Sequence, residues 1–234
     1  MYTPEIQLTA DGSHTLFVPH LNEHYHSING AIQESKHVYI DAGLNQCVKI
    51  KPEVLEFGFG TGLNALLTCY EANINNKVTR YTTIEKYPLN DSIYSLLNYE
   101  EFLPEDYASI FRKIHGCNWE TQVNISPYFS MRKICADFST FQLDQTYDVV
   151  YYDAFAPDKQ SEAWSPLIFD RLYDRMNPGG VLTTYCAKGE IRRRMIQAGF
   201  EVERIPGPPG KRQMLRAFKA SINQLPDIQP QKEY

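Results

Sequence analysis

The sequence predicts an α/β fold in which helices cover both faces of a mostly parallel sheet. Short apolar strands alternate with helical segments from residue 51 to residue 175, which is the pattern of a doubly wound sheet. A glycine-rich turn directly follows the first of these strands. Two final strands are joined by the short loop PGPPGK, which cannot make a crossover, so we expect a mixed sheet with an antiparallel last strand.

The first fifty residues predict a small N-terminal β-rich extension ahead of a domain spanning 51–220. QLTADGSHTLFVP carries Asp11-Gly12 between apolar stretches, a typical hairpin signal. HVYIDAGLN is interpreted as another strand. The tail, 221–234, contains two prolines among polar residues and is expected to be loosely ordered.

The remaining elements follow from local hydrophobic patterns and breakers. Strands are expected at EVLEFG, RYTTIEK, QVNIS, YFSMRKICAD, YDVVYYD, VLTTYC, FEVERIPG and RQMLRAFKA. Helices are expected at LNALLTCYEA, between Leu89 and Leu97, around EDYASIFRKI, at PLIFDRLYDRM and at GEIRRRMIQAG. The breaker cluster Asn177-Pro178-Gly179-Gly180 is expected to stop the helix before it.

Composition predicts a soluble, cytoplasmic protein. The hydrophobic fraction of 43% and the charged fraction of 22% are those of ordinary globular chains. The chain has neither a secretory signal pattern nor an apolar run of about 20 residues. Its five cysteines are scattered and odd in number, which argues against a disulfide framework.

Charge is unevenly distributed along the chain. The net charge is −5, but residues 188–219 hold nine Lys and Arg against three Glu, so this stretch carries +6 and the remainder −11. A local basic face can bind nucleic-acid phosphates. The alternative interpretation, equally compatible with these charges, is a helix face exposed to solvent.

The strongest local motif is VLEFGFGTGLN, in which Gly58, Gly60 and Gly62 follow a strand and precede a helix. Glycines allow a tight turn and close approach of a ligand to the backbone. The spacing is G-x-G-x-G rather than the G-x-G-x-x-G of dinucleotide sites. Glu56 suits the cationic end of S-adenosyl-L-methionine, directly or through water, so the motif predicts that cofactor.

Three further acidic residues follow predicted strands, where open α/β folds bind ligands. Glu85 is expected to accept hydrogen bonds from the ribose hydroxyls, and Asp137 to pair with the adenine amino group. Asp153, after DVVYYD, is the candidate catalytic residue because a carboxylate can hold or deprotonate an amine nucleophile. The sequence leaves open whether Asp153 acts as a base or an orienting group, or serves only as a structural cap or ion-pair partner.

The remaining candidates are aromatic residues and histidines that could line the pocket. His24, Tyr25 and His26 are predicted to contact substrate, because alternate histidines on a strand point to the same face. Phe155 lies in the loop after Asp153. Ordinary packing is the alternative. No ligand set with recognised spacing accompanies the histidines, so no metal is expected.

Several motifs occur in one order: EFGFGTGLN, DAFAP followed by Trp164, NPGG before VLTTYCAKG, and PGPPGKRQMLRA. In these the chain resembles the methyltransferase domain of the bifunctional tRNA 5-methylaminomethyl-2-thiouridine biosynthesis proteins. The resemblance implies a Rossmann-like class I fold and methylation of the aminomethyl nitrogen on C5 of the tRNA wobble uridine. It also implies a catalytic Asp153, cofactor positions at Glu56, Gly58, Gly60, Glu85 and Asp137, and RNA contacts by Lys211 and Arg212.

The family's bifunctional members carry a flavin-dependent oxidoreductase domain after the methyltransferase. This sequence stops soon after Phe218, so we expect a stand-alone enzyme whose aminomethyl uridine comes from a separate enzyme. Two alternatives stay open: a small-molecule or polyamine-type transferase, and a cofactor- or RNA-binding module without turnover.

Overall fold

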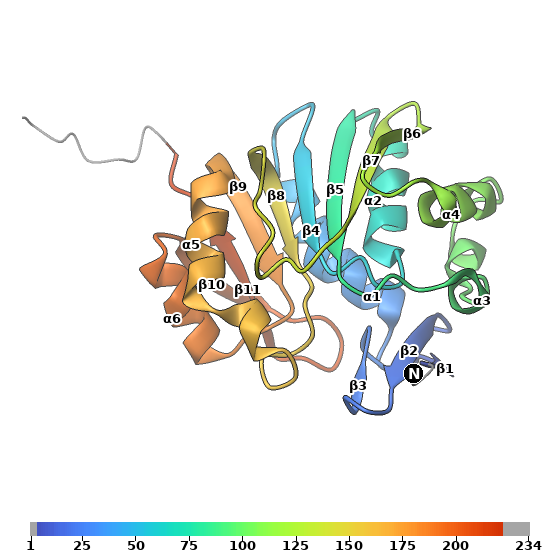
Figure 1. The fold of residues 1–234 in the computed structure, drawn as a ribbon, viewed down its shortest axis with the longest axis horizontal. Helices are drawn as coiled ribbons and strands as arrows, with labels where there is room; N and C mark the ends of the chain where they lie inside the picture. The colour runs from blue at the N-terminus through green and yellow to red at the C-terminus, as the bar shows by residue number, and fades with distance from the viewer. Residues whose placement is uncertain (1–3, 222–234) are drawn as a thin grey trace, which may run out of the picture.

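The computed structural model describes residues 4–221. The tail that was predicted to be loosely ordered lies, except for Ser221, outside the described residues. Eight strands form the central sheet (Figure 1). They are β4 (Glu53–Phe57), β5 (Thr79–Glu85), β6 (Gln122–Ser126), β7 (Phe129–Cys135), β8 (Tyr147–Tyr152), β9 (Met176–Thr184), β10 (Glu201–Pro206) and β11 (Gln213–Phe218).

The strand order is β10-β11-β9-β8-β4-β5-β7-β6. The central strands from β9 to β7 are parallel. β11 pairs antiparallel with both β9 and β10, so the last strand is inserted between its two predecessors. The predicted mixed sheet with an antiparallel last strand is confirmed.

Helices cover both faces of the sheet, and each face has its own apolar core. One core contains residues of α2 (Leu63–Ile74) and α4 (Tyr107–Gly116), and the other contains residues of α5 (Pro166–Arg175) and α6 (Gly189–Gln197). Shorter helical segments complete the fold: α3 (Asp91–Tyr94) and the 3-10 turns η3 (Tyr99–Phe102) and η4 (Ser161–Trp164). The helix expected between Leu89 and Leu97 is thus reduced to the four residues of α3.

The N-terminal region combines a small sheet with helical turns. The predicted hairpin is confirmed by the antiparallel strands β1 (Glu5–Leu8) and β2 (His14–Val18), which β3 (Glu23–His24) extends. Helix α1 (Ala31–Ser35), the π-helix η1 (Lys36–Asp41) and the 3-10 turn η2 (Leu44–Gln46) follow. Their apolar side chains join the same core as α2, so the first fifty residues are β-rich only as far as His24.

The strand predicted at HVYIDAGLN is wrong, because this segment forms η1 and η2. Val38, Tyr39 and Ile40 are all buried. A short apolar run enclosed on all sides has no alternation by which helix and strand could be distinguished.

The helix stops before the breaker cluster as predicted, but the cluster itself lies within a strand. Helix α5 already ends at Arg175, and residues 177–180 belong to the beginning of β9. The pairing register between β8 and β9 shifts there, which accommodates the proline and glycines within a strand. Among residues 4–221, no helix has the length and apolarity that crossing a membrane requires.

Candidate active site

The glycine-rich turn joins β4 to α2 in a backbone conformation that glycine favours. Gly58, Gly60 and Gly62 have φ angles of 90°, 49° and 74°, in the region that side chains with a Cβ rarely adopt. A Cβ on Gly58 would lie 2.7 Å from the carbonyl oxygen of Asp153. The turn therefore packs directly against the backbone at the end of β8.

Glu85, the last residue of β5, is hydrogen-bonded to this turn. The backbone N–H of Gly60 donates to Oε2 of Glu85 over 3.0 Å, and the N–H of Tyr87 donates to Oε1 over 2.8 Å. The ends of β4 and β5 thus bring the glycine motif and the predicted ribose-binding carboxylate together.

Asp137 lies just beyond the end of the neighbouring strand β7. Its carboxylate forms an ion pair with Nζ of Lys86 at 2.9 Å. It also accepts hydrogen bonds from the N–H and the hydroxyl of Ser139. The Ser139 hydrogen bonds, together with Lys86, hold the pKa of Asp137 below its usual value. It is thus a stable anion two residues after Cys135, which pairs with Glu85.

Glu56 occupies a different environment, inside the core. None of its surface is exposed. The hydroxyl of Thr83 donates to its Oε2 over 2.6 Å, while Oε1 has no hydrogen-bond partner within residues 4–221. Burial raises its pKa to about 8. Direct contact between Glu56 and a ligand on the turn is therefore not available in this conformation, and the spare oxygen could accept a hydrogen bond from bound water.

Asp153 follows β8 and is partly accessible. The phenol of Tyr39 donates to its Oδ1 over 2.5 Å, and the amide of Asn64 donates to its Oδ2 over 2.8 Å. Burial is the main cause that raises its pKa to about 7, against these two donors, which lower it. The carboxylate is thus oriented at both oxygens and changes charge near neutral pH, which suits a group that accepts a proton.

Aromatic side chains lie beside the turn. The Tyr25 ring would contact a Cβ on Gly60 at 2.9 Å and meets Phe155 edge to face, with 5.2 Å between ring centroids. His26 is buried, with Nε2 2.7 Å from Oγ1 of Thr61 within the turn, and burial lowers its pKa to about 4.

His24 is not brought to this group. Its Nε2 lies 3.0 Å from Oε1 of Gln7, and its ring packs on Phe17, so it belongs to the N-terminal sheet. The idea that both histidines share one strand face fails because β3 ends at His24.

The two basic residues predicted to bind RNA differ in their surroundings. Nζ of Lys211 forms a 2.7 Å ion pair with the mostly buried Glu34 and lies 4.1 Å from the ring centre of Tyr185. The Tyr185 hydroxyl donates to the carbonyl of Ala154, so Lys211 is linked to the loop after Asp153. Arg212 is exposed.

Sequence reasoning missed four residues of this group: Tyr39, Asn64, Glu34 and Tyr185. Asn64 stands two residues after the last glycine of the motif, and its place in the first turn of α2 was a usable signal. Tyr39 and Glu34 lie in segments whose helical conformation the sequence pattern concealed. Tyr185 directly follows the end of β9, and only tertiary contacts distinguish it.

The fold and the glycine turn define this protein as a Rossmann-like class I methyltransferase. The family model for S-adenosyl-L-methionine-dependent methyltransferases matches residues 99–220, and the chain belongs to this family. This confirms the predicted class of enzyme and its cofactor.

Two curated relatives share one description. The tRNA 5-methylaminomethyl-2-thiouridine biosynthesis bifunctional protein MnmC of Pseudomonas putida is 27% identical over 80% of this chain and 31% of its own length. The protein of the same description from Cupriavidus metallidurans is 28% identical over 92% of this chain and 34% of its own length. The chain thus spans about a third of the length of these relatives.

Solved structures support the fold. The crystal structure of MNMC2 from Aquifex aeolicus matches with a TM-score of 0.79 and 23% identity, over 94% of this chain and 71% of that chain. Spermidine synthase from Thermotoga maritima matches with a TM-score of 0.50 and 11% identity, over 94% of this chain and 79% of that chain. The fold alone therefore does not decide the substrate.

Proposed function

We propose that this protein transfers a methyl group from S-adenosyl-L-methionine to the aminomethyl nitrogen on C5 of the tRNA wobble uridine, in the cytoplasm. The observation that carries the proposal is the Asp153 carboxylate. It is partly accessible, it is oriented by Tyr39 and Asn64, and its backbone touches the glycine turn. The descriptions of the MnmC relatives support the choice of substrate.

The residues around the turn fit the cofactor. At Gly60 a Cβ would lie 2.9 Å from the ring of Tyr25, so only glycine lets the turn pack against that ring. The turn follows the first core strand, where open α/β folds bind their ligands. Glu85 and Asp137 lie at adjacent strand ends with lone pairs beyond those already used, which suits ribose hydroxyls and the adenine amino group. The unpartnered Oε1 of Glu56 suits a water-mediated contact with the cofactor's cationic end.

The cofactor, when bound, supplies an electrophilic methyl group. An amine attacks it only through a free lone pair, so the substrate ammonium must first lose a proton. Asp153, with a pKa raised to about 7 by burial, is ionised often enough at neutral pH to accept that proton. Tyr25 and Phe155 offer aromatic surface on which a splayed-out wobble base could stack.

Exposed arginines support an RNA substrate. Arg193, Arg204 and Arg212 are exposed and form no ion pair with any described residue. Guanidinium nitrogens of Arg193 and Arg204 both approach Gly189, at 3.5 and 3.7 Å from its ideal Cβ position. Two like charges that converge in this way favour an anion such as a backbone phosphate.

The test is a competition between substrates. Methyl-labelled cofactor is supplied with undermodified tRNA together with a small diamine. The proposal expects the label in the tRNA, at the wobble nucleoside. Label found only on the diamine would instead support a small-molecule amine methyltransferase, the alternative that the net charge of −5 favours.

A further inference from the structure

We propose that Tyr39 is a positioning residue for Asp153, whose phenol orients the carboxylate and keeps it ionised so that it can accept the proton of the substrate amine. The inference rests on the proposed function. It adds a residue from the N-terminal part of the chain to the machinery at the end of β8.

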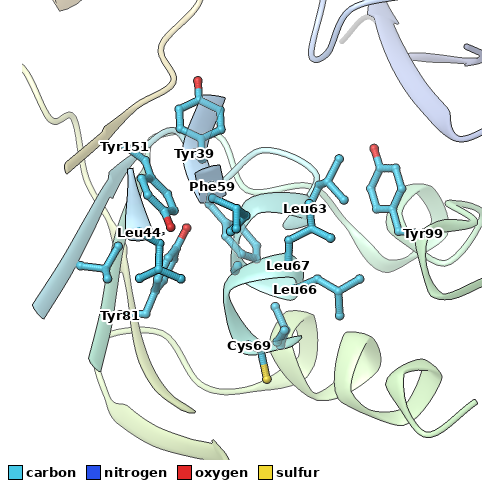
Figure 2. Packing of buried hydrophobic residues seen from close by; sticks show 14 of the residues in the cluster. Tyr39, Leu44, Phe59, Leu63, Leu66, Leu67, Cys69, Tyr81, Tyr99 and Tyr151 are labelled. Carbon is cyan, nitrogen blue, oxygen red and sulfur yellow. The ribbon is translucent and has the colours of Figure 1, made fainter. Parts of the chain in front are cut away.

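The contact is rigid on the tyrosine side. The Tyr39 side chain is 1% exposed, and its ring packs on Tyr151 with 5.2 Å between centroids. Figure 2 shows the two rings side by side, with the Tyr39 hydroxyl pointing away from the apolar cluster. That hydroxyl donates to Asp153 Oδ1 over 2.5 Å.

The π-helix η1 explains how a core residue reaches the catalytic edge. Short π segments are rare and occur frequently at functional sites. Its widened turn buries Val38, Tyr39 and Ile40 in succession. The following Gly43 fixes the turn, because a Cβ there would lie 2.5 Å from the carbonyl oxygen of Tyr39. The backbone and the ring of Tyr39 are therefore both fixed by packing, and this fixes the position of its hydroxyl at Asp153.

The two oxygens of Asp153 accept hydrogen bonds from chemically different donors. Asn64 donates to Oδ2 over 2.8 Å, and its amide can only donate there, whatever the charge of the carboxylate. The phenol on Oδ1 is the more acidic donor, and its hydrogen bond lowers the pKa of Asp153 more than that of Asn64 does. The titratable or charged groups around Asp153, from every element packed against it, are Tyr39, Glu34, Lys211, Tyr185, Glu56 and Tyr81.

Charges from the other neighbours oppose one another. Glu34 raises the pKa of Asp153 and Lys211 lowers it, and these two are paired with each other at 2.7 Å. The two effects therefore oppose each other at Asp153, and Tyr39 is the group that counteracts desolvation most.

The experiment compares Tyr39→Phe with Tyr151→Phe. Both remove one buried hydroxyl from adjacent rings, but that of Tyr151 contacts Thr68 at 3.2 Å. In Tyr39→Phe the acid limb of kcat/KM against pH should move up by roughly one unit, because a hydrogen bond to the anion is lost. The rate at pH 6 should then fall about tenfold and recover near pH 9, while cofactor affinity by calorimetry stays unchanged. Tyr151→Phe should leave the limb in place.

A second readout does not need turnover. The carboxyl carbon of Asp153, identified in ¹³C NMR spectra by its loss in Asp153→Asn, should titrate about one unit higher in Tyr39→Phe than in the unaltered protein. An unmoved titration and an unmoved acid limb would overturn the role of Tyr39. Activity on a small amine instead of tRNA, with the same limb shift, would overturn the proposed substrate and keep the role of Tyr39.

Discussion

Gly58→Ala tests whether the glycine turn and the end of β8 form one packed unit. Gly58 has a φ of 90°, and the added methyl would lie 2.7 Å from the carbonyl oxygen of Asp153 and 3.4 Å from its carbon. These are backbone atoms directly after β8, so no side-chain rotation relieves the overlap. A strained non-glycine backbone costs about 1–3 kcal/mol, and overpacking costs typically another 1–3 kcal/mol. We therefore expect a loss of about 4 kcal/mol in the free energy of unfolding.

Urea unfolding followed by circular dichroism measures this loss. Gly116→Ala is the matched control, because Gly116 has no heavy atom within 4 Å of its ideal Cβ position and no left-handed φ. The control should change the free energy of unfolding by less than about 0.5 kcal/mol. A Gly58→Ala protein that unfolds within about 1 kcal/mol of the unaltered chain would refute the packing described between the turn and Asp153.

Three further predictions concern the pH profile, the cofactor and the RNA. Burial raises the pKa of Asp153 to about 7, so kcat/KM should fall about tenfold per unit as the pH drops below 7, and an acid limb near pH 4 would contradict an Asp153 base. In Gly60→Val the new side chain meets the ring of Tyr25; calorimetry should show no cofactor binding although the melting curve stays cooperative, and unchanged affinity would count against the site. Replacing Arg193 and Arg204 by alanine should reduce the slope of log affinity against log salt for tRNA by about two, and an unaltered slope would exclude phosphate contacts there.

The sequence predicted most of the sheet because hydrophobic runs and breakers are local signals. Glu85 ends a buried parallel strand, Asp137 and Asp153 lie just after two others, and such strand ends meet at one edge of a sheet. That rule was enough to gather these carboxylates around the glycine turn. The antiparallel last strand could be predicted equally well, since its short connection to the strand before it allows only an antiparallel pairing.

What the sequence did not predict depends on tertiary contacts. Tyr39 lies in a run of consecutive buried residues, which carries no period from which a π-helix could be recognised. The pairing of Lys211 with Glu34 joins residues far apart in the chain, so the family resemblance that assigned Lys211 to RNA could not reveal this partner. His24 was grouped with His26 by alternation, but the strand that justified the grouping ends between them.

The most direct measurement uses two synthetic anticodon stem-loops that differ at one nucleotide. One carries 5-aminomethyl-2-thiouridine at the wobble position and the other carries uridine. With labelled S-adenosyl-L-methionine, nucleoside mass spectrometry should find one added methyl group on the aminomethyl nitrogen of the first and none on the second, and Asp153→Asn should slow the transfer at least about 100-fold. Equal labelling of both stem-loops, or of neither, would contradict the account.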